Sequence, residues 1–76
     1  MEIKKGIYQH YKGEKYEVYM TVQHSETEEW MVVYKALYGE QGMWVRPYDM
    51  FVEAVEVRGE RVPRFGYVGD KGEGNR

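Results

Sequence analysis

The residues of this chain that could carry out chemistry are few, and their spacing favours binding over catalysis. His10 and His24 are the only histidines, and the chain has no cysteine. If the first two strands form a hairpin that turns near Gly13, the histidines lie on the order of 23 Å apart at ~3.3 Å per residue. This separation disfavours a shared metal or acid–base site. We therefore expect no metal ion, no cofactor and no catalytic residue.

Activated nucleophiles and phosphate-binding loops are not indicated either. Ser25, Thr21 and Thr27 lack the surroundings of a nucleophile elbow. The glycines of the segment 39–42 lack the strand–loop–helix context and the Lys-Ser/Thr pair of a P-loop, so a turn explains them. The sequence predicts that the protein is not an enzyme.

The least ordinary stretch is LYGEQGMWVRPYDMF, residues 37–51, in a chain that is 16% aromatic. Arg46 is not expected to enter a small core, because an unpaired buried guanidinium is costly. Strand alternation then places Trp44 on the same outward side, with Met43 and Val45 facing inward. Outward Trp, Tyr and Arg side chains carry much of the binding energy at interfaces. The candidate ligand-binding residues are Trp44, Arg46, Tyr38, Tyr48 and Tyr19.

The alternative for Trp44 is a structural role, in which the GEQG loop or the end of the chain covers the indole ring. Trp44 would then belong to the core, and its removal would destabilise the fold strongly.

Two kinds of partner fit an aromatic face. A protein or peptide partner, such as a basic or proline-rich segment, would lie in an aromatic groove beside the acidic loop SETEE, residues 25–29. Single-stranded RNA would instead stack its bases on the rings, with Lys12, Lys15 and Arg46 near phosphates. The net charge of −2 disfavours this alternative. We expect a peptide-binding module that is a monomer or a weak dimer.

Short strands are the elements that would position these residues. Residues 16–23 alternate between apolar and polar types as a half-buried strand does, and GIYQHY precedes them across a Gly-containing turn. WMVVYKAL is rich in β-branched and aromatic residues, although Ser25 and Glu28 at capping-box spacing make a helix the competing interpretation. The remaining expectations are a strand at MWV, a helical turn at PYDMF, a strand at AVEV and an edge segment at RVPRFGYV.

The expected core follows from the same alternation. Its members are Val18, Met20, Val22, Val32, Val45, Phe51, Val55 and Val57. Residues 1–68 are expected to form a single domain, and residues 69–76, which carry no apolar anchor, a disordered tail.

Length and composition limit the possible classes of protein. A chain of 76 residues is expected to form one domain with a small core. No apolar run approaches the ~18 residues of a membrane span, and the opening MEIKKG does not resemble a signal peptide. The absence of cysteine suits a reducing compartment, so we expect a cytoplasmic protein.

The order of these elements resembles a small SH3-like β-barrel of five or six strands with one helical or 3₁₀ turn, and fold alone does not give function. A more specific resemblance is carried by GIYQHYKGEKYEV, HSETEEWMVVYKALYGEQGMWVRPYDMF and VPRF, in that order. Together they resemble the bacterial family known as domain of unknown function 1653, over roughly residues 6–65. The resemblance implies no established activity and no catalytic residues.

Overall fold

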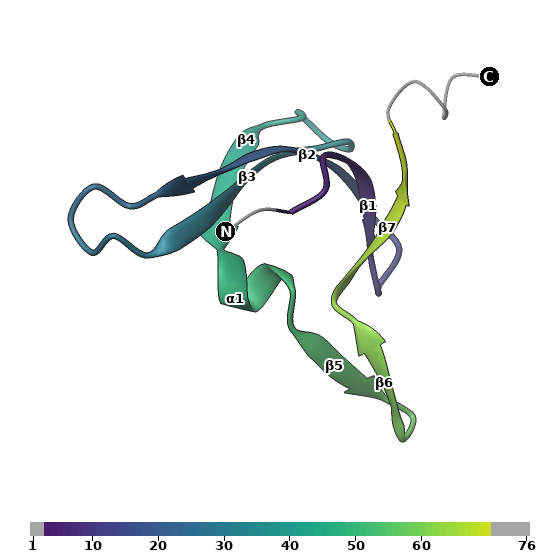
Figure 1. The fold of residues 1–76 in the computed structure, drawn as a ribbon. Coiled ribbons are helices and arrows are strands. Elements are labelled where there is room, and N and C mark those ends of the chain that lie inside the picture. The colour runs from purple at the N-terminus through teal and green to yellow at the C-terminus, as the bar shows by residue number, and fades with distance from the viewer. Residues whose placement is uncertain (1–2, 71–76) are drawn as a thin grey trace.

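A computed structural model describes residues 3–70 of the chain. They form seven strands and one short helix, arranged around an interior that the longest strands arch over (Figure 1). In chain order the elements are β1 Gly6–His10, β2 Lys15–Gln23, β3 Trp30–Ala36, β4 Met43–Pro47, α1 Tyr48–Phe51, β5 Ala54–Val57, β6 Glu60–Pro63 and β7 Phe65–Gly69.

The strands form two antiparallel sheets. A five-stranded sheet has the order β4-β3-β2-β1-β7, and a separate two-stranded sheet consists of the β5–β6 hairpin. The predicted mainly β fold is confirmed. The ladders of the described residues form these two sheets and do not join into a closed barrel.

The segment with two competing interpretations is a strand. Trp30–Ala36 pairs with β2 on one side and with β4 on the other. Val32 and Val33 lose side-chain freedom in a helix and pack well on a pleated sheet, which favours the strand. The predicted helical turn after Pro47 is also confirmed as α1.

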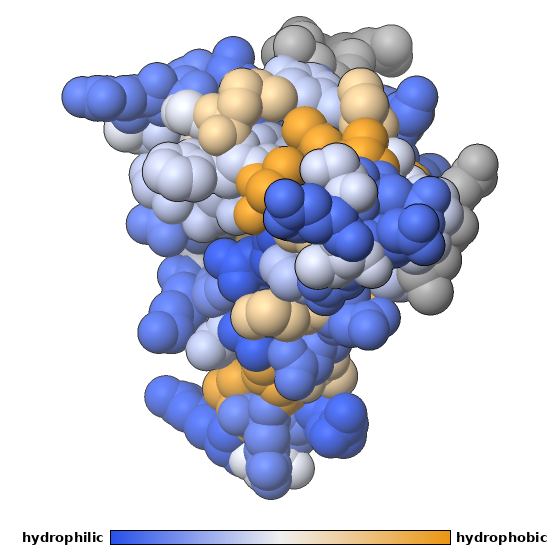
Figure 2. All heavy atoms as spheres, turned by 90° about the vertical axis from the view of Figure 1, so that its left-hand side faces the viewer, coloured by the Kyte–Doolittle hydropathy of each residue, from blue (hydrophilic) through white to orange (hydrophobic). Residues whose placement is uncertain are grey.

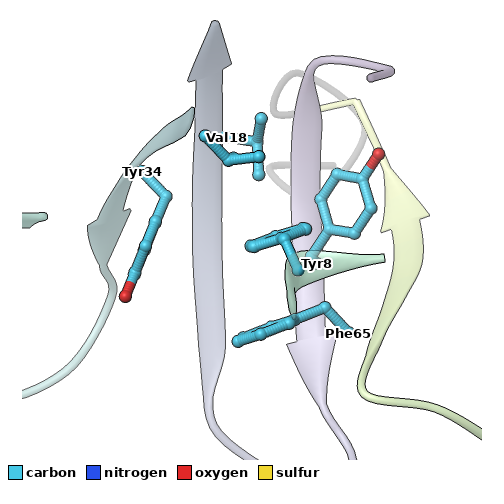
Figure 3. Packing of buried hydrophobic residues seen from close by; sticks show 6 residues of the cluster. Tyr8, Val18, Tyr34 and Phe65 are labelled. Carbon is cyan, nitrogen blue, oxygen red and sulfur yellow. The ribbon is translucent and has the colours of Figure 1, made fainter. Parts of the chain in front are cut away.

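The core lies on one face of the five-stranded sheet, which we call the core face. Val18, Val32 and Tyr34 of this face form a buried cluster with Tyr8 and Phe65. Figure 3 shows Val18, Tyr34, Tyr8 and Phe65 within this cluster. Phe51 closes the cluster from α1, and its ring stacks on that of Phe65 with centroids 4.2 Å apart. Aromatic rings therefore fill most of this interior, whereas the sequence pattern predicted a core made mostly of valines.

A β-bulge in β2 explains the main errors in the predicted core. Val18 lies opposite Tyr34 and Met20 lies opposite Val33, so Tyr19 is an extra residue on β2. One extra residue reverses the face on which every later side chain projects. Met20 therefore leaves the core face and is 49% exposed, contrary to the prediction.

The opposite face of the sheet, which we call the outer face, carries apolar residues without a covering layer. Val33 lies between Met20 of β2 and Val45 of β4, and Val45 is 56% exposed. Figure 2 shows apolar residues at the surface in the upper part of the molecule, where this sheet lies in Figure 1, and a second group lower down, at the height of the β5–β6 hairpin. The prediction that Val45 is a core residue is wrong, because only the core face of the sheet is covered.

The other predicted core residues divide into two groups. Val18, Val32 and Phe51 are buried in the cluster, as predicted. The rest are only partly buried, and they are Val22 on β2 and Val55 and Val57 on the β5–β6 hairpin.

The bulge predicts different costs for two substitutions on the same strand. Val18→Ala should lower the free energy of unfolding by about 1–3 kcal/mol, because it leaves a cavity in the core. Met20→Ala should lower it by less than about 1 kcal/mol, because the Met20 side chain is largely solvated. Urea melts followed by tryptophan fluorescence measure both values, and equal losses would contradict the reversed alternation.

The described part of the chain extends beyond the predicted domain boundary at residue 68. β7 continues through Gly69, which lies opposite Ile7 of β1, and the Tyr67 hydroxyl donates a hydrogen bond to Asp70. Residues 71–76 of the predicted tail lie outside the described residues. Within residues 3–70, no helix is long and apolar enough to cross a membrane.

Candidate functional site

An open groove of about 420 Å³ lies at one end of the core face. The start of β2, the end of β3, the turn at residues 37–42 and β4 surround it. We call it the aromatic groove, and its principal residues are Tyr16, Tyr34, Tyr38, Trp44 and Arg46.

Strand register brings these residues together from three separate strands. Tyr34 of β3 lies opposite Trp44 of β4, and Ala36 lies opposite Tyr16 of β2. Residues that lie directly opposite each other in an antiparallel pair project on the same face. The groove is therefore a continuation of the core face beyond the point where the core ends.

The turn between β3 and β4 shapes one wall of the groove. The N–H of Gln41 donates to the carbonyl of Tyr38 over 3.1 Å, and Gly39 adopts a left-handed φ of 60° that glycine tolerates well. A Cβ atom on Gly42 would lie 3.2 Å from Nε1 of Trp44. The indole ring therefore rests against the turn, and the small residue at position 42 gives it room.

The predicted pairing of Trp44 with Arg46 is correct, but the face assigned to them is wrong. The two residues lie opposite Tyr34 and Val32, which are both core residues, so they project on the core face. Trp44 remains 60% exposed because β4 is the edge strand and the core ends before it. Met43 and Val45, expected to face inward, are on the uncovered outer face.

Arg46 forms the charged end of the groove. Its guanidinium carbon lies 5.5 Å from the centroid of the Phe65 ring, a distance at which the cation and the ring attract each other. Its Nε atom is buried and makes no hydrogen bond with the described residues. The prediction that Arg46 faces away from the core is wrong. The Arg46 side chain can project on the core face because it is only partly buried and contacts an aromatic ring.

A pair of tyrosines forms the opposite end. The hydroxyl groups of Tyr16 and Tyr38 are hydrogen-bonded at 3.0 Å, and their rings meet edge to face. The Tyr16 ring also packs edge to face against Tyr34 and Phe65. Burial raises the pKa of Tyr16, and the hydrogen bond between Tyr16 and Tyr38 raises this pKa further. The groove thus has an aromatic lining with a neutral end at Tyr16 and a cationic end at Arg46, and the acidic residue Glu40 lines it from the turn.

The raised pKa of Tyr16 predicts a loss of stability in alkali. Above the ordinary tyrosine pKa of 10.0, the unfolded chain releases the Tyr16 proton while the folded chain retains it. The free energy of unfolding should therefore fall as the pH rises from 10 toward the higher pKa of the folded state. Tyr16→Phe should reduce this fall, as measured by urea melts between pH 8 and pH 11. An unchanged pH dependence would contradict the assigned role of Tyr16.

The two remaining predicted site residues lie elsewhere. Tyr48 on α1 is partly buried and packs against the core cluster. Tyr19 is the bulge residue of β2, where its hydroxyl donates to Glu17, and it lines a separate depression with Lys5. The structure therefore brings together Tyr38, Trp44 and Arg46 of the predicted set.

The groove residues that the sequence interpretation missed are Tyr16 and Tyr34. Alternation with polar neighbours places Tyr16 on the same face as Val18, whereas the sequence predicts Tyr34 only as a member of the strand at WMVVYKAL. The sequence pattern does not reveal the pairing register between strands, which places Tyr16 opposite Ala36 and Tyr34 opposite Trp44.

The acidic loop at residues 25–29 does not flank the groove, contrary to expectation. It joins β2 to β3 at the end where Gln23 lies opposite Trp30, whereas the groove lies at the end where Tyr16 lies opposite Ala36. The two ends of β2 are on the order of 23 Å apart at ~3.3 Å per residue. The charged residues that line the groove are therefore Arg46 of β4 and Glu40 of the turn between β3 and β4.

The two histidines lie at different ends of the sheet and each stabilises a turn. Nδ1 of His10 accepts the N–H of Lys12 at 3.1 Å, and Nδ1 of His24 accepts the N–H groups of Glu26 and Thr27. Among residues 3–70, no cluster of three or more His, Asp or Glu side chains could hold a metal ion.

A wider hollow of about 530 Å³ lies between the β1–β7 edge of the large sheet and the β5–β6 hairpin. Its walls include Gln9 and Tyr67 from the large sheet and Val57 and Val62 from the hairpin. This hollow lies where the two sheets meet. The aromatic groove differs from it because its aromatic rings and its guanidinium group all come from one sheet and the turn that connects two of its strands.

Comparisons with known proteins place the chain in a family. The family model described as "Protein of unknown function (DUF1653)" matches residues 6–67. A crystal structure of a protein from this family, from Bordetella bronchiseptica, is 37% identical in sequence and superposes with a TM-score of 0.82 over 90% of each chain. No curated protein matches the chain significantly. The resemblance seen in the sequence is thus confirmed, and the chain belongs to the DUF1653 family of proteins of unknown function.

Proposed function

We propose that this chain is a protein- or peptide-binding module and that the aromatic groove is its binding surface. The observation that carries the proposal is the exposed indole of Trp44, which stands beside Arg46 in a groove that other aromatic rings line. Trp, Tyr and Arg are the residues most enriched among those that dominate binding energy at protein interfaces. Small soluble domains seldom leave such a cluster exposed without a use.

The shape of the groove supports an extended segment as the ligand. It is open to solvent and bounded by rings, so it suits a side chain that stacks or packs while the rest of the peptide stays outside. A hydrogen-bond acceptor on the ligand at the Arg46 end would add a charge-assisted hydrogen bond with the guanidinium group that lines the groove.

We also propose that the fold is of the SH3-like type, as an open form of the barrel predicted from the sequence. The strong curvature of the five-stranded sheet and the position of α1 between β4 and β5 support this proposal (Figure 1). SH3-type domains bind extended peptides in aromatic-lined grooves, and fold alone does not establish such an activity.

Substitution of Trp44 tests the proposed surface. Trp44→Ala should weaken binding of a peptide by about 1 kcal/mol or more, because the indole supplies much of the contact area. The free energy of unfolding should change by less than about 1 kcal/mol, because the side chain is mostly solvated. Peptide pools titrated into ¹⁵N-labelled protein, followed by NMR, identify a ligand for this comparison.

Val45→Ala is the matched control, because Val45 is the next residue of β4, is similarly exposed and projects on the outer face. It should bind the same peptide as the wild-type chain does. Equal binding by Trp44→Ala and the wild-type chain would contradict the proposal. Tight binding of oligonucleotides that weakens steeply with salt would instead favour single-stranded RNA as the partner.

A further inference from the structure

Two basic side chains from distant parts of the sequence contact the Phe65 ring, and a third basic residue is close to one of them. The Arg46 guanidinium carbon of β4 lies 5.5 Å from the Phe65 centroid, and the His10 ring of β1 has its centroid 4.9 Å from the same point. Arg64 immediately precedes Phe65 in the chain, and its charge acts on His10 together with that of Arg46. No sequence motif links His10 to Arg46, and only the folded sheet brings them to one ring.

Both arginines have an unused hydrogen-bond donor at this position. Nε of Arg46 and Nε of Arg64 are each buried and make no hydrogen bond with the described residues. Arg64 also donates from Nη2 to Glu53 over 3.0 Å, so one carboxylate already offsets part of its charge. Burying an N–H group without an acceptor costs more free energy than a typical hydrogen bond contributes to stability. An anionic acceptor would remove this cost by forming a charge-assisted hydrogen bond.

His10 adds a third donor and reports the local potential. Its Nδ1 accepts the N–H of Lys12, so the neutral ring carries its proton on Nε2. Burial lowers the pKa of His10, and the positive charges of Arg64, Arg46 and Lys12 lower this pKa further, while Glu14 opposes them. The ring therefore lies in a region of positive potential despite the net negative charge of the chain.

We propose that Arg46, Arg64 and His10 form a site for a carboxylate of the peptide that occupies the aromatic groove. This inference rests on the proposed function, because Arg46 lines the groove and also belongs to the basic cluster. Guanidinium groups match the planar geometry of a carboxylate and bind it through charge-assisted hydrogen bonds. The carboxylate belongs to an Asp or Glu side chain or to the C-terminus of the peptide.

This site reverses the expected charge of the partner. The sequence favoured a basic or proline-rich segment because an acidic loop was expected beside the groove. The loop joins the far ends of β2 and β3, and the charges at the Arg46 end of the groove are predominantly positive. An acidic residue next to an aromatic or apolar residue is therefore the pattern that this surface recognises.

Acetate tests the anion site directly and without a peptide. The probe is ¹⁵N NMR of the arginine Nε–H groups during titration with sodium acetate at pH 7, with sodium chloride keeping the ionic strength constant. The Arg46 and Arg64 signals should shift and saturate, whereas those of the exposed Arg58, in the β5–β6 turn, and the exposed Arg61, on β6, should not. Shifts at Arg46 and Arg64 no larger than those at Arg58 and Arg61 would overturn the site.

A second readout excludes a general effect of salt. A bound carboxylate stabilises the imidazolium form, so acetate should raise the pKa of His10 relative to chloride. The ring proton signals of His24, at the other end of the sheet, should respond equally to acetate and to chloride. An acetate-dependent change of equal size at both histidines would also overturn the site.

Synthetic dipeptides identify the source of the carboxylate and separate this inference from the proposed function. The probes are acetyl-Glu-Tyr-amide, acetyl-Gln-Tyr with a free C-terminus and the neutral acetyl-Gln-Tyr-amide. At least one of the two carboxylate-bearing probes should bind about tenfold more tightly than the neutral one, as a single charged hydrogen bond allows. Arg46→Gln should abolish this preference, and Arg61→Gln should retain it.

The possible failures are distinguishable. Equal affinities of the three dipeptides, with loss of binding in Trp44→Ala, would contradict the carboxylate site and leave peptide binding in place. Saturable acetate shifts at Arg46 and Arg64, with peptide binding that is unaffected by Trp44→Ala, would support the anion site and contradict the groove as the peptide surface.

Discussion

Phe51→Ala should lower the free energy of unfolding by about 3–5 kcal/mol, as large aromatic truncations in cores do. The Phe51 side chain is 1% exposed, stacks on Phe65 and meets the ring of Tyr8 edge to face at 5.4 Å. A domain of 76 residues has a total stability of about 4–11 kcal/mol at typical values per residue. The substitution should therefore remove a large part of the stability of the whole domain.

The cost also depends on the short helix that carries Phe51. α1 is a four-residue helix, too short to be stable alone, and its position after β4 depends on the packing of this ring. Met50→Ala is the matched control, because Met50 lies in the same turn and is exposed. Its expected cost is below about 1 kcal/mol. Guanidinium melts of both variants measure the two losses of unfolding free energy. Similar losses would show that Phe51 does not anchor the interior.

Gly6→Ala should be the most damaging change on the backbone. Gly6 has a φ of 137°, and a Cβ atom there would lie 2.7 Å from the carbonyl oxygen of Gly69 on β7. The contact is with backbone, so β1 and β7 would have to separate at their irregular pairing. Overpacking of this kind destabilises by about 1–3 kcal/mol, in addition to the strain of the positive φ.

Gly13→Ala separates the two contributions. Gly13 has a similar φ of 118°, but nothing lies within 4 Å of the position of its Cβ atom. It should therefore show the conformational strain without the clash. Thermal melts should give Gly6→Ala a lower melting temperature than Gly13→Ala. Each kcal/mol of lost stability lowers the melting temperature by about 4–8 °C in a domain of this size. Equal melting temperatures would mean that the approach of Gly69 does not constrain the strand.

The groove and the uncovered outer face differ in the kind of interaction they offer. The outer face carries a row of Met and Val side chains, whereas the groove combines rings, a hydrogen-bonded hydroxyl pair and a guanidinium. Directional groups of the second kind fix the orientation of a ligand and give specificity. For this reason the proposed ligand site lies on the core face.

The sequence by itself determined the local structure well. The β-branched and aromatic residues of Trp30–Ala36, the alternation at the start of β2 and the proline before α1 each predicted the element that forms. Neighbouring residues decide these features. The family resemblance was visible for the same reason, because it depends on motifs in a fixed order.

Tertiary structure decided which face each side chain joins. Strand alternation predicted that Trp44 and Arg46 share a face, but only the register with Val32 and Tyr34 shows that this face bears the core. The bulge at Tyr19 moved Met20 to the outer face, because one inserted residue reverses the alternation of everything that follows it. The convergence of His10 and Arg46 on Phe65 likewise depends on pairings between residues far apart in the chain, and local pattern holds no information about those pairings.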